Sequence, residues 1–126
     1  MIDMSFQWND KEPIYLQLKD QIKDMILSGD IAEGEALPSV RQVAIEYQVN
    51  PITVSKSYQI LVDEELVEKK RGLGMFVQMG AQHKLQANEN EQFINEDWPK
   101  ILTKIQHLNL DTTQLINSLK EIGRNQ

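Results

Sequence analysis

The stretch Asn50-Pro51-Ile52-Thr53-Val54-Ser55-Lys56 decides the fold, because it marks the start of a helix. Asn50 is a strong N-cap residue, and Pro51 falls at the first helical position, where its missing N–H costs nothing. The helix that begins here is the second half of a predicted helix-turn-helix. Counting about 100° per residue from Val54, its inner side carries Tyr58, Leu61 and Val62.

A shorter helix precedes this one, and a tight turn separates the two. Ser39 can cap the shorter helix, and Gln42 stands three residues later, at the capping-box position. This helix should end near Tyr47, which leaves Gln48 and Val49 for the turn. The pattern is typical of a helix-turn-helix, whose second helix enters the major groove of DNA.

A longer helix is predicted over residues 13–28, before the helix-turn-helix. Proline suits its opening turn, and Gly29 can adopt the left-handed conformation that ends it. Apolar residues recur at steps of three and four, which predicts one buried side: Ile14, Leu18, Ile22, Met25 and Ile26. Residues 30–36 then predict a loop with room for a short edge strand.

Two strands are predicted after the helix-turn-helix, at residues 66–70 and 75–78. Gly72 and Gly74 join them, since glycine allows the positive φ of a tight hairpin and the close approach of backbone to a phosphate. The tip of this hairpin adds three cations, Lys69, Lys70 and Arg71. The order of elements predicts a winged helix-turn-helix over residues 1–78, a mainly α fold with a small β-hairpin wing.

The outward side of the helix that Asn50 begins carries side chains that can read a DNA groove. Ile52, Lys56 and Gln59 point away from the core, with Thr53 and Ser55 on the flanks. Lys56 can reach a phosphate or a guanine edge, Gln59 or Ser55 can hydrogen-bond a base, and Ile52 can contact a thymine methyl group. Without the flanking elements, a solvent-facing helix would explain this row better.

The formal net charge of -6 at first argues against nucleic acid, because Lys and Arg supply most non-specific affinity by neutralising phosphates. The distribution of charge matters more than the sum. Between residues 38 and 62 the chain carries Arg41 and Lys56 against Glu46, and the hairpin tip adds cations without an acid. The basic residues therefore gather on the parts expected to contact DNA, although an ordinary solvated face is the alternative.

Composition argues against several other classes of protein. The 126 residues suffice for one modest core, with no cysteine, no signal peptide and no apolar run near the roughly 18 residues of a membrane span. We therefore expect a cytoplasmic protein without a membrane partner. His83 and His107 lack partners at ligand spacing, so no metal or cofactor is expected. No catalytic set emerges, which argues against an enzyme.

Residues 79–126 predict a linker and a short helical dimerisation tail. Residues 81–92 are polar and fit either a linker or the outer side of a connecting helix. Two short amphipathic helices should follow, with Pro99 in a first turn or at a kink and Asp111 as the cap of the second. Their apolar positions are Trp98, Ile101, Leu102, Ile105 and Leu108, then Leu115, Ile116, Leu119 and Ile122.

These two helices cannot bury both apolar faces against each other alone. Pairing with the same segment of a second chain around a two-fold axis would cover them and present two recognition helices to one operator. The alternative is a tail folded back on its own winged domain through Phe6 and Trp8. A tail of about 46 residues is too short for a ligand cavity within one chain, although a cleft between subunits stays possible and the small-molecule effector is unknown.

Five short motifs lie within residues 11–78: Pro13-Ile14-Tyr15 with Gln17-Leu18, Ser28-Gly29-Asp30, Leu37-Pro38-Ser39-Val40-Arg41, Val49-Asn50-Pro51 with Thr53-Val54, and Gly72-Leu73-Gly74-Met75-Phe76-Val77. Together they resemble the GntR family of bacterial transcription regulators, and the short tail is most similar to its YtrA-like branch. The resemblance implies a homodimeric repressor whose winged helix binds double-stranded DNA at an operator of inverted half-sites.

The resemblance also implies which residues contact DNA. By position these are Ser39 and Arg41 at the start of the second helix, Asn50, Thr53, Ser55 and Lys56 on the recognition helix, and Arg71 and Gly72 in the wing. Position 52 is usually polar in this pattern, and we expect Ile52 to trade a hydrogen bond for contact with a thymine methyl group. The other hypothesis is a protein-interaction module whose winged helix docks a protein without specific DNA binding.

Overall fold

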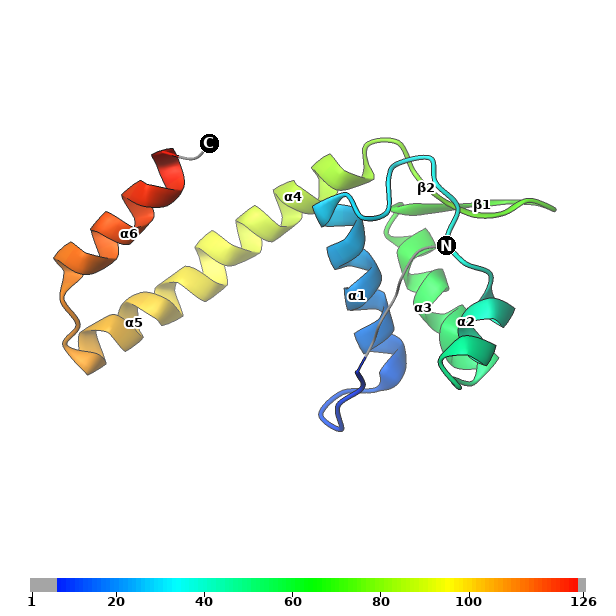
Figure 1. Cartoon of the computed structure of the whole chain (residues 1–126), viewed down its shortest axis with the longest axis horizontal. Coiled ribbons are helices and arrows are strands. Elements are labelled where there is room, and N and C mark those ends of the chain that lie inside the picture. Colours follow the sequence, from blue (N-terminus) through cyan, green and yellow to red (C-terminus); the bar gives the residue numbers. More distant parts are fainter. Residues whose placement is uncertain (1–6, 125–126) are drawn as a thin grey trace. The chain divides into compact units, whose positions relative to one another are not determined.

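The computed structural model of this chain describes residues 7–124 and divides into two compact units, Met1–Asn88 and Glu89–Gln126 (Figure 1). The elements follow one another as α1 (Ile14–Ser28), α2 (Val40–Glu46), α3 (Pro51–Asp63), β1 (Val67–Lys70), β2 (Gly74–Val77), α4 (Ala81–Gln92), the π-helical turn η1 (Phe93–Asp97), α5 (Trp98–Leu108) and α6 (Thr112–Arg124). The predicted fold class, mainly helical with a small hairpin wing, is confirmed.

α1 begins and ends at the residues that the sequence marks for it. Pro13 stands at its N-cap, and Gly29 follows it in the left-handed conformation, with a φ of 90°. Three of the predicted core residues on it are buried: Leu18, Ile22 and Ile26. The prediction is wrong for Ile14, which remains 36% exposed. Side chains lean toward the N-terminus of a helix, so the side chain of the first residue projects past the helix end.

α3 is the central helix of the first unit. It packs against α1, α2 and β1. Its inner side carries the predicted Val54, Tyr58 and Leu61, all of which are at most 1% exposed. Figure 1 shows α1, α2 and the hairpin around it. This packing fixes which side of α3 can face a partner.

The hairpin pairs β1 with β2 in antiparallel register, with Lys70 opposite Gly74 at the tip. On its other edge β2 meets the loop before α2, where Ala36 forms a single antiparallel bridge with Phe76. The edge strand that residues 30–36 could form is thus reduced to one bridge. Through this bridge the wing is joined to the loop that leads into the helix-turn-helix.

One hydrophobic core holds the first unit together. Its buried apolar side chains are Leu18, Ile22, Ile26, Ile31, Leu37, Val43, Ala44, Val49, Val54, Tyr58, Leu61, Leu66, Val67, Val77, Ala81 and Leu85. Trp8 packs against this core and is half-buried, whereas Phe6 lies outside the described residues. Because Ala81 and Leu85 belong to the core, the first unit continues past residue 78, where the predicted winged domain ends.

The start of α4 is held by side chains of the first unit. Glu33 accepts a hydrogen bond from the backbone N–H of Gln82 through Oε2 over 3.0 Å, and the Gln82 Nε2 donates to the Leu27 carbonyl oxygen over 2.9 Å. Of the two possibilities for residues 81–92, linker or connecting helix, the structure has the helix.

Pro99 shapes the beginning of the second unit. It stands in the first turn of α5, as expected for a proline in this segment. Because proline has no N–H to donate, regular α-helical bonding is interrupted here, and η1 precedes it with a bond from the Trp98 N–H to the Phe93 carbonyl oxygen. α5 ends where Asn109 adopts the left-handed conformation.

α6 begins at its predicted cap, because Asp111 accepts a 2.9 Å hydrogen bond from the Thr113 N–H. No described residue of α5 or α6 is buried. Trp98, Ile105 and Leu115 are half-buried, and the other apolar positions predicted for dimerisation are exposed: Ile101, Leu102, Leu108, Ile116, Leu119 and Ile122. The two helices leave most of their apolar surface uncovered.

Candidate nucleic-acid interface

The helices of the helix-turn-helix are fixed at their first residues by the predicted caps. Ser39 and Gln42 form a reciprocal capping box, in which each side chain accepts from the backbone N–H of the other over 3.0 Å. Asn50 Oδ1 accepts from the Ile52 N–H over 2.9 Å. Both caps are confirmed, and they fix how the first turns of α2 and α3 present their side chains.

The caps leave donors on two candidate DNA-binding side chains. In the caps, the Ser39 hydroxyl oxygen and the Asn50 Oδ1 act only as acceptors. Among the described residues, the Ser39 hydroxyl hydrogen and the Asn50 amide nitrogen can therefore still donate to a phosphate oxygen. Arg41 stands exposed in the first turn of α2. The start of α2 therefore offers a neutral donor and a cation, and the start of α3 offers a neutral donor.

The outward side of α3 carries the predicted row. Ile52 is 66% exposed, Ser55, Lys56 and Gln59 are exposed, and Thr53 is half-buried. The row therefore lies opposite the core side of the same helix. A groove-reading helix requires this separation, because base edges are reached only by side chains that no core contact holds.

Gln59 is engaged within its own helix. Its Nε2 donates to Asp63 Oδ1, one turn later, over 2.8 Å. The bond directs the amide toward a carboxylate, which repels phosphate. Gln59 must give up this bond to reach a base, whereas Ser55 and Lys56 have no such bond to lose among the described residues.

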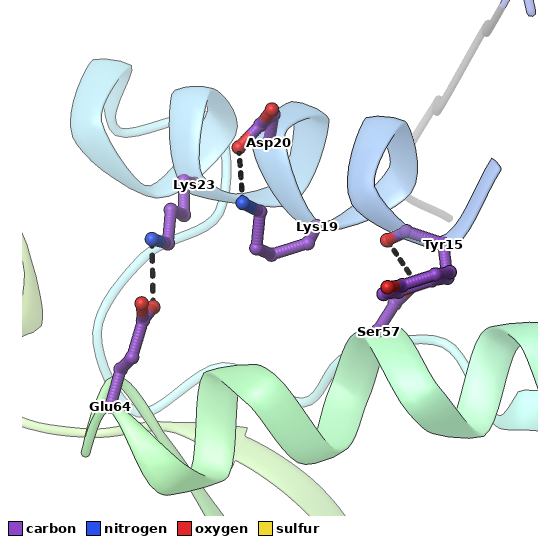
Figure 2. Close-up of polar contacts among 6 residues, drawn as sticks. All are labelled: Tyr15, Lys19, Asp20, Lys23, Ser57 and Glu64. Atoms are coloured by element: carbon purple, nitrogen blue, oxygen red, sulfur yellow. Dashed lines mark hydrogen bonds and ion pairs between the residues drawn. The ribbon is translucent and has the colours of Figure 1, made fainter. Parts of the chain in front are cut away.

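A buried serine ties α3 to α1. The Ser57 hydroxyl donates to the Tyr15 carbonyl oxygen over 2.6 Å, and an ion pair of 2.7 Å joins Lys23 of α1 to Glu64, directly after α3 (Figure 2). Ser57 is absent from the predicted site because serine carries no apolar signal. Its place three residues after Val54 is the one sign in the sequence that it faces inward.

Two glycines shape the tip of the wing. Gly72 and Gly74 have φ values of 78° and 118°, which L side chains rarely adopt. The Leu73 N–H between them donates to the Lys70 carbonyl oxygen over 2.9 Å and closes the turn. The predicted hairpin thus carries Lys70 and Arg71 at its exposed end.

Unpaired cations lie on the helix-turn-helix and the wing. Within residues 7–124, the ion pairs engage Lys19, Lys23, Lys84 and Arg124. The candidate cations of the interface are exposed and take no part in these pairs: Arg41, Lys56, Lys69, Lys70 and Arg71. Despite the net charge of -6, this surface can offer uncompensated positive charge to phosphates.

Other kinds of site are not supported by the part of the chain that the structure describes. No three His, Asp or Glu side chains there are placed to hold a metal ion, and His83 and His107 lie in separate units. None of the described helices is both long and apolar enough to cross a membrane. The surface formed by α2, α3 and the hairpin is therefore the candidate site.

Residues 14–77 match the family model of bacterial regulatory proteins of the gntR family. This chain belongs to the GntR family. The matched residues run from the first residue of α1 to the last residue of β2 and include every candidate DNA-binding residue. The chain is thus a transcription regulator with a winged-helix DNA-binding domain, not an enzyme.

Two relatives from Bacillus subtilis (strain 168) extend this finding. The chain is 33% identical to the HTH-type transcriptional repressor YtrA, over 88% of this chain and 85% of YtrA. It is 39% identical to the uncharacterized HTH-type transcriptional regulator YhcF, over 59% of this chain and 61% of YhcF. The YtrA alignment spans 111 residues and so includes part of the segment after residue 78. The resemblance to the YtrA-like branch is confirmed.

Two solved structures are similar in fold. A GntR family transcriptional regulator from Listeria monocytogenes superposes with a TM-score of 0.72 at 25% identity, covering 90% of this chain and 98% of the other. The DNA-binding domain of AraR, solved in complex with operator ORE1, superposes with a TM-score of 0.51 at 25% identity, covering 60% of this chain and 92% of AraR. The winged helix-turn-helix is therefore shared with a domain that is seen on DNA.

Proposed function

We propose that this GntR-family regulator is a sequence-specific repressor that binds, as a homodimer, an operator of inverted half-sites. α3 enters the major groove with Ile52 and Ser55 toward the base edges and Lys56 within reach of a phosphate, and the wing follows the adjacent backbone. The observation that carries the proposal is the exposed row of α3, on a helix that a cap fixes at its start and that a buried hydrogen bond fixes on its inner side.

Apart from Gln59, which is bound to Asp63, the remaining candidate residues hold the backbone of DNA. Ser39, Arg41 and Asn50 donate to phosphates near the helix starts, Thr53 supports them from the flank of α3, and Lys70, Arg71 and Gly72 do so from the wing. Phosphate contacts of this kind set register and orientation, and base contacts set sequence. The operator complex of AraR supports DNA as the ligand, and the name of YtrA supports repression. Such a protein works in the cytoplasm.

The tail supports the dimer. α5 and α6 have no buried residue and carry exposed leucine and isoleucine at helical spacing, a surface that costs free energy in water until a partner covers it. A second copy of the same surface, related by a two-fold axis, covers it and supplies the second recognition helix. Trp8, one of two residues that a folded-back tail would use, already packs against the core of the first unit.

The test begins with the selection of bound fragments from random duplex DNA by the full chain. Affinity for the selected duplex is then measured against salt concentration. Neutralisation of several phosphates gives a log-log slope of several units, about 0.9 for each phosphate. Arg41→Ala and Lys56→Ala should weaken binding without unfolding the protein. Lys100→Ala, which removes the same charge from α5, should bind like the wild type.

Two results would contradict the proposal. Unchanged binding by both interface variants would remove α2 and α3 from the contact. Failure to enrich any sequence, together with a shallow salt dependence, would favour a winged helix that docks a protein instead.

A further inference from the structure

Two parts of the proposed interface, α3 and the wing, each carry a lysine that lies over an aromatic ring. The Lys56 Nζ of α3 is 5.5 Å from the centroid of the Tyr15 ring of α1. The Lys70 Nζ of β1 is 4.8 Å from the centroid of the Phe76 ring of β2. Both distances lie within the roughly 6 Å over which a ring face attracts a cation.

The two rings are less exposed than the two lysines. Tyr15 and Phe76 are half-buried, whereas both lysines are exposed and form no ion pair within residues 7–124. The Tyr15 backbone is bound by Ser57, the residue directly after Lys56. The Phe76 backbone is held by pairing with Glu68 and by the bridge to Ala36. Each ring therefore stands on backbone that is held in place, and each lysine beside it is exposed.

We propose that Tyr15 and Phe76 are positioning residues for DNA binding, which hold the ammonium groups of Lys56 and Lys70 in place before DNA arrives. A free lysine side chain loses rotamer freedom when it binds a phosphate, and a ring that restricts it beforehand lowers that cost. A carboxylate would restrict it too, but would compete with phosphate for the charge. A ring leaves the charge and the N–H donors available. This inference rests on the proposed function.

The first test measures affinity for the duplex that the wild-type chain selects from random DNA. Tyr15→Leu and Phe76→Leu remove the rings, and each should weaken binding about two- to fivefold per subunit. Tyr15→Phe and Phe76→Tyr keep a ring and serve as matched controls, which should bind like the wild type. Thermal unfolding of each variant shows whether it remains folded.

The second test separates positioning from a structural or direct role. In a Lys56→Ala background, Tyr15→Leu should cause no further loss, because no ammonium group remains to be held. Lys56→Ala should also lower the salt slope by about one unit per subunit, whereas Tyr15→Leu should leave the slope unchanged. Equal losses in both backgrounds would overturn the proposal, since they would mean that Tyr15 stabilises α1 or touches DNA itself.

A third measurement needs no DNA. Protons over a ring face are shielded, so the ε-methylene protons of Lys56 and Lys70 should resonate upfield of those of Lys100 in the free wild-type protein. Tyr15→Leu should remove the shift of Lys56 alone. Unshifted protons in the wild type would overturn the proposal even if Tyr15→Leu fails to fold. If the wild type selects no DNA, the proposed function and this inference fail together. If it binds selectively but the losses caused by Tyr15→Leu and Lys56→Ala add, only the inference fails.

Discussion

The hydroxyl group of Tyr58 donates a 2.6 Å hydrogen bond to the carbonyl oxygen of Pro38, 20 residues earlier in the chain. Tyr58 lies on the inner side of α3 and is 1% exposed, and Pro38 directly precedes the cap of α2. Burial raises the pKa of the Tyr58 hydroxyl, so it remains a donor throughout the neutral range. The bond joins the middle of the recognition helix to the start of the other helix of the motif.

Tyr58→Phe should therefore destabilise the winged unit. It removes the donor but keeps the ring, so the Pro38 carbonyl loses its partner without a large cavity, and we expect a loss of about 1–3 kcal/mol in the free energy of unfolding. Urea unfolding followed by circular dichroism measures this. Tyr15→Phe, at a half-buried tyrosine, is the control. A loss for Tyr58→Phe no larger than that of the control would mean that the bond contributes nothing net.

Asn50 has a structural role and a proposed DNA-binding role, and two substitutions separate them. Asn50→Ala removes the cap and should cost about 1 kcal/mol of stability, whereas Asn50→Asp keeps an acceptor for the Ile52 N–H and should retain the stability. Asp replaces the amide donor by a negative charge, which phosphate repels, so this variant should bind the operator more weakly than the wild type. Unfolding and binding measured on the same samples test both expectations. Full operator affinity for Asn50→Asp would exclude Asn50 from the contact.

The helix starts of the winged unit could be predicted because their signals are local. Ser39 with Gln42, and Asn50 with Pro51, place caps within a few residues of the helices that they begin, and the structure has both. Spacing also predicts the burial of Leu18, Ile22 and Ile26 on α1 and of Val54, Tyr58 and Leu61 on α3. The outward row of α3 could be predicted for the same reason, since it is what remains when the buried side is removed.

Features that depend on distant residues could not be predicted. Ser57 is buried, and its hydroxyl meets a carbonyl oxygen of α1 that lies 42 residues away in the chain. Residues 81–92 are mostly polar, yet Ala81 and Leu85 of α4 enter the core, and Glu33 binds the start of this helix from 49 residues away. A periodicity argument does not see partners that only tertiary folding brings together.

Glu33 should make stability depend on pH. The N–H groups of Gly80 and Gln82 hold the pKa of this carboxyl below its usual value of about 4.5. The unfolded chain therefore takes up the proton at higher pH than the folded chain, and the stabilisation is present above about pH 4.5 and lost as pH falls through the lowered pKa. Urea midpoints between about pH 6 and about pH 3 should fall less for Glu33→Gln than for the wild type. Glu46→Gln, an exposed carboxylate of α2, is the control, and equal slopes for all three proteins would contradict the expectation.

Ile52 should sense the methyl group of thymine. Replacing thymine by uracil removes only that methyl group, and burial of one methyl group is worth about 0.8 kcal/mol, or about fourfold in affinity. Wild-type protein should therefore lose about fourfold when uracil replaces one particular thymine of a half-site. Ile52→Ala should bind both duplexes equally, whereas Ser55→Ala should still distinguish them. If no thymine position of the operator shows the effect, Ile52 reads no methyl group.

Leu119 tests whether the tail joins two chains. It is 56% exposed on α6, within the apolar face that we propose pairs with a second copy. Leu119→Asp would place a charge in that interface and should give a monomer by sedimentation, whereas the wild type should sediment as a dimer. The monomer should lose about 10²-fold or more in affinity for the full operator, because the second recognition helix is no longer tethered, but should keep the affinity for a single half-site. Asn117→Asp introduces the same charge at an exposed polar position of α6 and should remain dimeric. If the wild type has the mass of a monomer at every concentration, the proposed dimer is contradicted, and the apolar faces of α5 and α6 must bind a different partner.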